Sequence, residues 1–240
     1  MRKIDVLNVK FDNVTMDEAV ERALKCIHKH EASYVVTPNP EIVMEALENE
    51  HLLTALDAAS LVLPDGIGII YGARILGTPL RAKVPGIDFI EKVMEKLANQ
   101  NGSVYLFGAK PGIAQEAGER LAQKYPGLEI CGCADGYFND DSGIIEEINR
   151  KKPDLLLVCL GFPKQEIWMY DNKKQLDVGL MAGLGGSLDV FAGHVTRAPL
   201  SWQKLGLEWL YRLLKQPSRI GRMMRLPVFL LRVIKKRVIK

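Results

Sequence analysis

Two apolar segments of this chain end abruptly in residues that could perform acid–base chemistry. Residues 33–36 are followed by the sequence TPNPE (37–41), and residues 61–63 are followed by Pro64-Asp65-Gly66. An open α/β sheet binds its ligands at the carboxyl ends of its strands. A carboxylate at such an end, followed by a glycine that lets a ligand approach the backbone, could act as a general base. Asp65 is therefore the first candidate catalytic residue.

Further polar residues follow other strand-like segments. They are Thr37 and Asn39 within TPNPE, the stretch GFPKQE (161–166), and Leu188-Asp189. Each of them could merely cap a helix or brace a turn. With Asp65 they make four clusters, however, and four clusters at one edge of a sheet favour a binding site.

Two glycine turns are candidates for binding phosphate. Gly66-Ile67-Gly68 and the turn Gly108 to Gly112 each follow a predicted strand and precede a predicted helix. Backbone N–H groups at a helix N-terminus could meet a diphosphate there, although a plain tight turn explains such glycines equally well. Neither turn has the dinucleotide-binding fingerprint, because Tyr71 stands where the third glycine would fall, and the chain has no P-loop.

The sequence gives little support for a metal site or a covalent serine mechanism. Its four histidines are scattered, no Asp-x-Asp occurs, and no Gly-x-Ser-x-Gly elbow is present. The four cysteines lack the spacing of zinc or redox motifs, so we interpret them as reduced core thiols. We therefore expect catalysis without a metal or another cofactor.

The order of the apolar segments predicts an α/β fold. The 240 residues are 48% hydrophobic and can form one large core, or a core with an appendage. Thr15 with Glu18 three residues later predicts a capped helix start. We predict strands at 2–10, 33–36, 60–63, 103–107, 128–133, 154–160 and 178–182, and helices at 15–30, 42–48, 67–76, 113–125, 142–151, with one more that follows 85–88 as far as 100. This alternation is typical of a Rossmann-like, mostly parallel sheet with helices on both faces, here assigned to residues 1–195.

The charge of the chain is divided unevenly. Residues 209–240 contain six arginines, four lysines and no acid, so a net charge of +3 leaves −7 for residues 1–208. Residues 202–214 have helical apolar spacing and Pro217 should end that helix. The longest later apolar run, Leu226 to Leu231, is far shorter than the roughly 20 residues that span a bilayer. We predict that residues 196–240 form a basic, amphipathic helical appendage that docks on an anionic membrane surface.

Several motifs together resemble a known enzyme family. They are TPNPE, LPDGIG, RILGTPL with VPGID, YLFGA, GYF, GFPKQE, and GLGGSLDVFAG with RAP, in this order between about residues 5 and 200. This succession resembles the WecG/TagA/CpsF family of bacterial glycosyltransferases, which includes teichoic acid linkage-unit enzymes. The resemblance implies transfer of an N-acetylmannosamine-type sugar from UDP to N-acetylglucosamine on undecaprenyl diphosphate. It also implies inversion of the anomeric centre without a metal.

The resemblance assigns roles to residues of this chain. It implies that Asp65 is the general base, that Thr37, Asn39 and Gln165 line the sugar and acceptor pocket, and that the YLFGA and GYF segments, with Tyr137, lie near the nucleotide. Lys83 stands where arginine is expected, so a bidentate phosphate contact is not expected there. Because the body is acidic, we expect a tail arginine to fold over the pocket and neutralise the diphosphate. The candidates are Arg212, Arg219 and Arg222.

Alternatives to this hypothesis remain at the level of sequence. The donor could be another UDP sugar, such as UDP-N-acetylmannosaminuronic acid, or the chain could be a lipid-binding module without activity. A nucleic-acid partner is disfavoured because Phe229 is the only aromatic residue beyond Leu226. The N-terminal sequence lacks the pattern of a signal peptide, so we expect a cytoplasmic protein on the inner face of the membrane. The apolar helix at 202–214 must be covered, for example by the body, lipid or a second subunit in a homo-oligomer.

Overall fold

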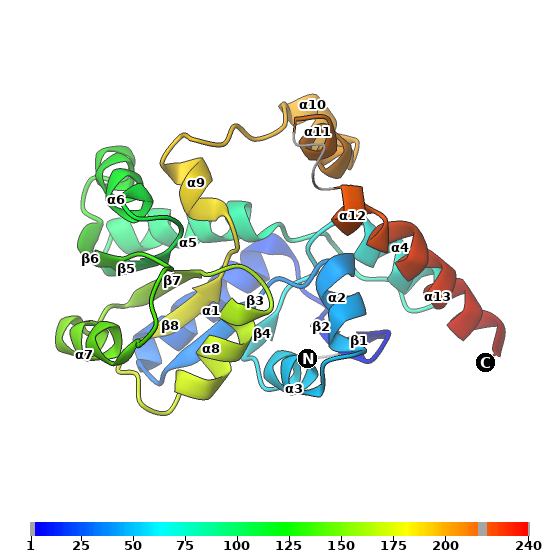
Figure 1. Ribbon diagram of the computed structural model, residues 1–240, viewed down its shortest axis with the longest axis horizontal. Helices are drawn as coiled ribbons and strands as arrows, with labels where there is room; N and C mark the ends of the chain where they lie inside the picture. Colours follow the sequence, from blue (N-terminus) through cyan, green and yellow to red (C-terminus); the bar gives the residue numbers. More distant parts are fainter. Residues whose placement is uncertain (1–2, 216–219, 240) are drawn as a thin grey trace.

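A six-stranded parallel sheet forms the centre of the protein (Figure 1). The computed structural model describes residues 3–215 and 220–239, and at positions 204, 212, 222 and 223 it describes the backbone only. The strand order is β4-β3-β8-β7-β5-β6, and every pairing is parallel. The strands are β3 (Ser33–Val36), β4 (Leu61–Val62), β5 (Ser103–Gly108), β6 (Glu129–Ala134), β7 (Leu155–Cys159) and β8 (Leu180–Gly183). The carboxyl ends of all six strands therefore meet at one edge of the sheet.

Helices cover both faces of this sheet because strand side chains alternate between two apolar cores. Tyr34 and Val36 enter one core and Val35 enters the other. The first core is shared with α2 (Pro40–Ala46), α3 (Glu50–Asp57), α4 (Ile67–Ile75), α7 (Ser142–Lys151) and α8 (Lys164–Asn172). The second is shared with α1 (Met16–Lys29), α5 (Gly86–Ala98), α6 (Ile113–Lys124) and α9 (Ser187–Phe191). The predicted Rossmann-like α/β class is confirmed.

The first predicted strand is wrong in one respect. Residues 2–10 do not form a single strand, because the chain reverses at Leu7 and Asn8, which both have positive φ (52° and 70°). The result is an antiparallel hairpin of β1 (Lys3–Val6) and β2 (Val9–Asp12). The apolar alternation continues through the turn and so hides it. The hairpin packs beside β4, and buried Asp12 accepts a hydrogen bond from the Val62 backbone at 2.9 Å.

Three helices of the structure were not predicted from the sequence. α3 begins directly after α2 because the Asn49 side chain accepts a hydrogen bond from the Leu52 backbone and caps a new helix. α9 is only five residues long. α8 was missed because its buried face carries Gln165 and Glu166 beside Trp168, which masks the apolar periodicity. Those two buried polar residues lie at the sheet edge where the motifs gather.

The C-terminal region is helical, as predicted, but its first helix is broken. The segment 202–214 forms α10 (Leu200–Lys204) and α11 (Glu208–Lys215), because Gly206 adopts a positive φ of 72° between them. They are followed by α12 (Ile220–Met223) and α13 (Arg225–Ile239). Across the two described ranges, 3–215 and 220–239, no helix is long and apolar enough to cross a membrane.

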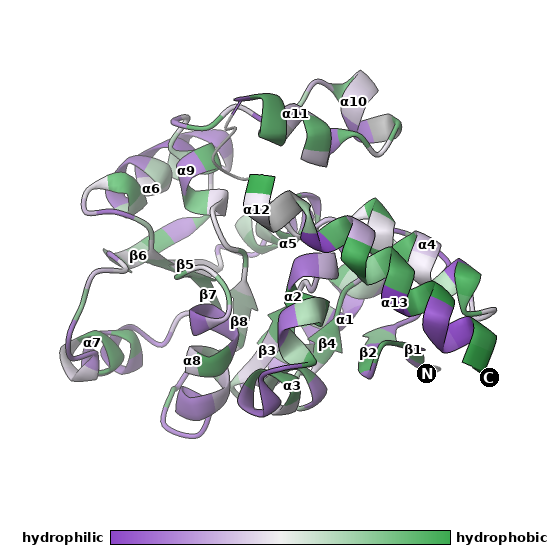
Figure 2. Ribbon diagram, turned by 45° about the vertical axis from the view of Figure 1, so that its right-hand side comes forward, coloured by the Kyte–Doolittle hydropathy of each residue, from purple (hydrophilic) through white to green (hydrophobic). Residues whose placement is uncertain are grey.

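α13 packs on the body of the protein beside α4 (Figure 1). Phe229 and Val233 are fully buried, and a Cβ atom on Gly72 of α4 would lie 2.9 Å from the Phe229 ring. Arg225 forms an ion pair with Glu45 of α2 at 2.7 Å. Figure 2 shows that hydrophobic and hydrophilic residues alternate along α13. Part of the predicted appendage thus shares the core of the body, and a boundary at residue 195 stays a prediction.

Candidate active site

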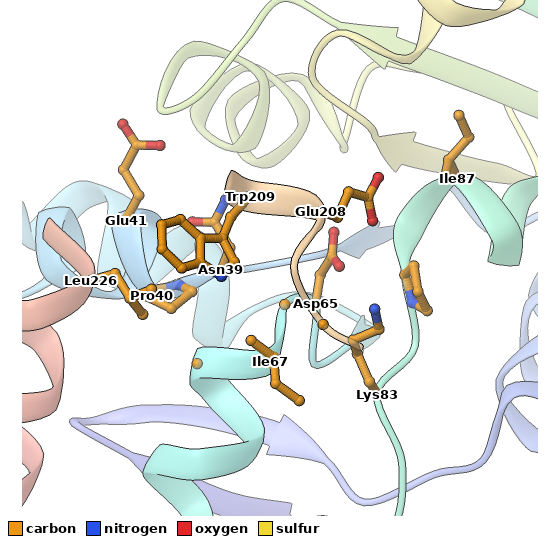
Figure 3. Close-up of a pocket in the computed structure, with 14 residues that line it drawn as sticks. Asn39, Pro40, Glu41, Asp65, Ile67, Lys83, Ile87, Glu208, Trp209 and Leu226 are labelled. Carbon is orange, nitrogen blue, oxygen red and sulfur yellow. The ribbon is translucent and has the colours of Figure 1, made fainter. Parts of the chain in front are cut away.

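A pocket of about 200 Å³ lies at the carboxyl edge of the sheet, beyond β3 and β4 (Figure 3). Its wall combines the turns that follow these two strands, the segment before α5, and residues of the C-terminal region. The lining residues are Asn39, Pro40, Glu41, Asp65, Gly66, Ile67, Gly68, Lys83, Pro85, Ile87, Gly206, Glu208, Trp209 and Leu226. Of the candidate site residues, Asp65, Gly66, Asn39 and Lys83 meet here.

Asp65 is half-buried in this pocket, and its backbone is held on both sides. The Leu63 N–H donates to the Val36 carbonyl at 2.9 Å, and the Val84 N–H donates to the Pro64 carbonyl at 2.9 Å. Figure 3 shows Asp65 between Asn39 and Lys83, with Glu208 facing the same space. A carboxylate and an ammonium group therefore share one cavity with a fixed backbone beneath them.

Gly66 permits the tight turn that carries Asp65 into α4. It has a positive φ of 85° and stands at the N-cap of this helix without a side-chain cap. Two residues later, a Cβ atom on Gly68 would lie 2.6 Å from both Pro40 and Leu226. The start of α4 is thus packed closely against α2 and α13 at the pocket wall.

Asn39 both lines the pocket and caps a helix. Its Oδ1 accepts a hydrogen bond from the Ile42 backbone at 3.0 Å at the start of α2. The helix-cap interpretation of this residue is therefore correct, and its side chain is held at the cavity wall by that same bond. Thr37, two residues earlier, donates from its hydroxyl to the Gly183 carbonyl at 3.4 Å.

Gln165 lies beside Thr37 rather than in the pocket lining. It is buried, and a Cβ atom on Gly183 would lie 3.2 Å from its amide nitrogen. Its Oε1 accepts from the Gly185 N–H at 2.8 Å, and its Nε2 donates to Glu166 at 2.8 Å. The turns after β3, β7 and β8 are therefore connected by hydrogen bonds around Gly183.

Glu166 was not among the candidate site residues, although it belongs to GFPKQE. Its side chain is completely buried, and Oε2 has no hydrogen-bond partner among the described residues. Burial disfavours the charged form and raises the pKa of Glu166 to about 7. The sequence gives no signal of this burial, because burial depends on which neighbours the fold brings to Glu166.

The YLFGA and GYF segments lie side by side beyond β5 and β6. The Gly136 N–H donates to the Ala109 carbonyl at 2.9 Å, and Tyr137 is 69% exposed. Gly108 has a positive φ of 131°, and a Cβ atom there would lie 2.3 Å from the Cys159 carbonyl oxygen. Gly108 and Tyr137 are absent from the lining of the pocket around Asp65. The need for glycine at 108 is explained by backbone packing.

The structure does not describe the side chains of the three tail arginines. Arg219 lies outside the described residues, and Arg212 and Arg222 are described by their backbone in α11 and α12 only. The tail nevertheless reaches the site, through Glu208 and Trp209 of α11 and through Leu226 of α13. None of these three residues was among the candidate site residues predicted from the sequence.

This architecture defines the class of the protein. A Rossmann-like sheet with a carboxylate and a lysine in a pocket at its carboxyl edge is typical of enzymes that bind nucleotides or nucleotide sugars. The family model described as Glycosyl transferase WecG/TagA/CpsF family matches residues 4–240. The chain belongs to this family and is a glycosyltransferase.

Two named relatives show how far the similarity extends. Both are named N-acetylglucosaminyldiphosphoundecaprenol N-acetyl-beta-D-mannosaminyltransferase. The protein from Bacillus spizizenii (strain W23) is 35% identical over 209 residues, which cover 87% of this chain and 81% of the relative. The protein from Staphylococcus aureus (strain MW2) is 36% identical over 243 aligned residues, which cover 99% of this chain and 95% of the relative.

Proposed function

We propose that this chain transfers N-acetylmannosamine from UDP-N-acetylmannosamine to N-acetylglucosaminyl-diphospho-undecaprenol. The product would carry a beta-1,4 linkage, as in the linkage unit of wall teichoic acid. The names of both relatives contain this acceptor and this sugar. The observation that carries the proposal to this chain is the pocket in which Asp65 and Lys83 lie together at the carboxyl edge of the sheet.

Asp65 acts as the general base in this proposal. It removes the proton from the attacking hydroxyl of the acceptor while that oxygen forms a bond to the anomeric carbon. The bond from the anomeric carbon to the β-phosphate oxygen breaks on the opposite side, so UDP leaves and the configuration inverts. The half-buried position of Asp65 supports this role, because the carboxylate is accessible from the pocket and fixed by its turn.

Negative charge builds up on the diphosphate as UDP leaves, and a nearby positive charge stabilises it. Lys83 lines the same pocket as Asp65 and can supply an ammonium group to a phosphate oxygen. It does so as a point charge, whereas arginine would bind two oxygens at once. Arg212, Arg219 and Arg222 are proposed to add charge from the tail, since α11 already places Glu208 and Trp209 at the pocket. We propose no metal or other cofactor for this step.

The remaining candidates orient the two substrates. Asn39 lies in the pocket wall, and Thr37 and Gln165 form the hydrogen-bonded edge beside it, so these residues are placed to contact the sugar or the acceptor. The exposed ring of Tyr137 and the turn at Gly108 lie at the ends of β6 and β5, where a nucleotide could bind. Neither Gly108 nor Tyr137 lines the pocket around Asp65, so this nucleotide position rests on the ends of β5 and β6 alone.

We further propose that the protein works at the inner face of the cytoplasmic membrane, where a polyprenyl acceptor resides. The C-terminal helices expose large apolar side chains, which an interfacial helix would bury in lipid. They include Leu200, Leu205, Leu214, Ile220, Met224, Leu231 and Val238. Flotation with vesicles that contain anionic lipid, compared with DNA retardation at the same salt concentration, tests this surface. DNA retardation without vesicle flotation would contradict the membrane proposal. Sedimentation velocity would test whether the protein forms a homo-oligomer.

The decisive test is release of UDP from UDP-N-acetylmannosamine in detergent, measured without and with EDTA, and with and without a short-chain prenyl-diphosphate N-acetylglucosamine acceptor. We expect release that depends on the acceptor and is abolished in Asp65→Asn. Release only from another donor, such as UDP-N-acetylmannosaminuronic acid, would keep the mechanism and change the substrate. No release from any donor would contradict the proposal and favour a lipid-binding module, and loss of release on addition of EDTA would contradict the metal-independent step.

A further inference from the structure

Glu166 is a buried carboxyl group that the proposed chemistry does not use. It is completely buried, and one of its two oxygens has no hydrogen-bond partner among the described residues. Such an oxygen lowers the stability of the folded state, since it loses its bonds to water on burial. Burial is the main cause of its raised pKa, which the hydrogen bond from Gln165 only partly opposes. A methionine of similar length would fill this space without that loss.

The Glu166 side chain forms a hydrogen bond with Gln165. Its Oε1 accepts a hydrogen bond from the Gln165 amide nitrogen at 2.8 Å. The oxygen of the same amide accepts from the Gly185 N–H at 2.8 Å. A backbone N–H can only donate, so the amide oxygen must face Gly185 and the NH₂ group must face Glu166. Glu166 supplies the acceptor that this orientation requires.

The position of Glu166 on α8 directs it toward the site. Successive residues of an α-helix are 100° apart, so Glu166 and Trp168 project from α8 in nearly opposite lateral directions. Trp168 packs on Phe107 of β5 and donates to Asp141 next to α7. Glu166 therefore projects away from Phe107 and Asp141, and the elements that α8 contacts are α3, β8, β3 and β7. It lies in the first turn of this helix, close to the end of β3 that leads to Thr37.

We propose that Glu166 is a positioning residue: it fixes the amide of Gln165 and, through it, the glycine turn 183–186 that also contacts Thr37. The turns after β3, β7 and β8 are then held in one arrangement by three successive hydrogen bonds. This inference rests on the proposed transfer reaction, because Gln165 and Thr37 are its candidate substrate-binding residues. Glu166 itself is buried and does not touch substrate.

Two substitutions separate this role from a role in stability. Glu166→Gln keeps an acceptor oxygen for the Gln165 amide, whereas Glu166→Met keeps the length of the side chain and removes the acceptor. We expect kcat/KM to fall by about 10-fold to 100-fold in Glu166→Met, as misplaced site groups usually cause. Glu166→Gln should stay within about threefold of wild type, because its hydrogen bond remains.

Hydrogen exchange tests the same inference without any turnover. Amide exchange in residues 183–186 should become faster in Glu166→Met and stay unchanged in Glu166→Gln, while the Tm of neither variant falls by more than about 3 °C. Asp154→Leu is the matched control. The Asp154 carboxylate likewise accepts a hydrogen bond, from the Ser103 backbone N–H at 2.8 Å, but at the amino end of the sheet. Its loss should lower Tm and leave exchange at 183–186 and kcat/KM at wild-type values.

The outcomes distinguish the two proposals. Absence of turnover in the wild type would count against the transfer reaction, and the exchange data would still decide the role of Glu166. The positioning role is wrong if Glu166→Met exchanges and turns over like wild type, or if Glu166→Gln is impaired equally. It is also wrong if Glu166→Met does not fold, because Glu166 would then serve the fold. In a Gln165→Leu background, Glu166→Met should reduce kcat/KM no further.

Discussion

Replacing Glu166 with glutamine should change how the stability of this protein depends on pH. Burial raises the pKa of Glu166 from the ordinary 4.5 to about 7. In the unfolded chain this carboxyl ionises near pH 4.5, whereas in the folded protein it stays protonated up to about pH 7. Between these values the folded state holds an extra proton, so the free energy of unfolding falls as the pH rises.

The size of this effect follows from the difference between the two pKa values. One pKa unit corresponds to about 1.4 kcal/mol at 25 °C, so the folded protein loses about 3 kcal/mol by pH 8. The loss is absent below pH 4.5, where the carboxyl is protonated in both states, and it is constant well above pH 7. Because glutamine does not ionise, the variant Glu166→Gln lacks this loss at every pH.

Urea unfolding of wild type and Glu166→Gln at pH 5 and pH 8 measures the effect. The difference in unfolding free energy between the two proteins should change by about 2.5 kcal/mol between these pH values, with the variant gaining relative stability at pH 8. All other titrating groups are shared by the two proteins and cancel in this comparison. An equal difference at both pH values would show that the Glu166 carboxyl is not desolvated and would refute the reasoning.

Three further substitutions, the first with Leu231→Ala as its control, test other parts of the structure. Phe229→Ala should lower the free energy of unfolding by about 3 to 5 kcal/mol and make α13 exchange hydrogen faster, because loss of a fully buried ring leaves a cavity. Leu231→Ala, at a 66% exposed position, should lower it by less than about 0.5 kcal/mol. Urea unfolding measures both. Equal effects would mean that α13 is not docked. Gly108→Ala should lower Tm strongly, since its Cβ would lie 2.3 Å from the Cys159 carbonyl oxygen, and a normal melting curve would contradict the described turn. Asp65→Asn should fold with a wild-type Tm and lower kcat by about 10² to 10⁴-fold, and a variant with near-normal turnover would not be compatible with a general base at this position.

Most of the sheet could be predicted from the sequence because its signals are local. Segments such as 103–108 and 155–159 are continuous apolar runs, which is typical of parallel strands buried on both faces. The capping box at Thr15 and Glu18 marks the start of α1, and both of its hydrogen bonds are present. The errors at 2–10 and 202–214 share one cause. A positive φ at Asn8 or at Gly206 reverses or breaks an element while the apolar pattern continues through it.

The candidate site was predicted in part. Asp65, Asn39 and Lys83 meet in one pocket because they follow or flank neighbouring strands β3 and β4, and strand order at a parallel edge brings such residues together. Gly108 and Tyr137 follow strands at the other side of the sheet, and no sequence pattern gives the order of strands. Their inclusion with Asp65 in one binding region is a proposal that substrate binding must test.

The sequence by itself determined the class of fold, the strand ends that carry polar residues, and the family, because these depend on local composition and on the order of motifs along the chain. Only the tertiary structure decided which residues share the pocket and which carboxyl is buried. Trp209 reaches the cavity of Asp65 from the other end of the chain, and Glu166 loses its water through contacts with separate strands and helices. Both facts depend on packing between distant segments, and a side chain's burial and pKa are set by those neighbours and not by its place in the sequence.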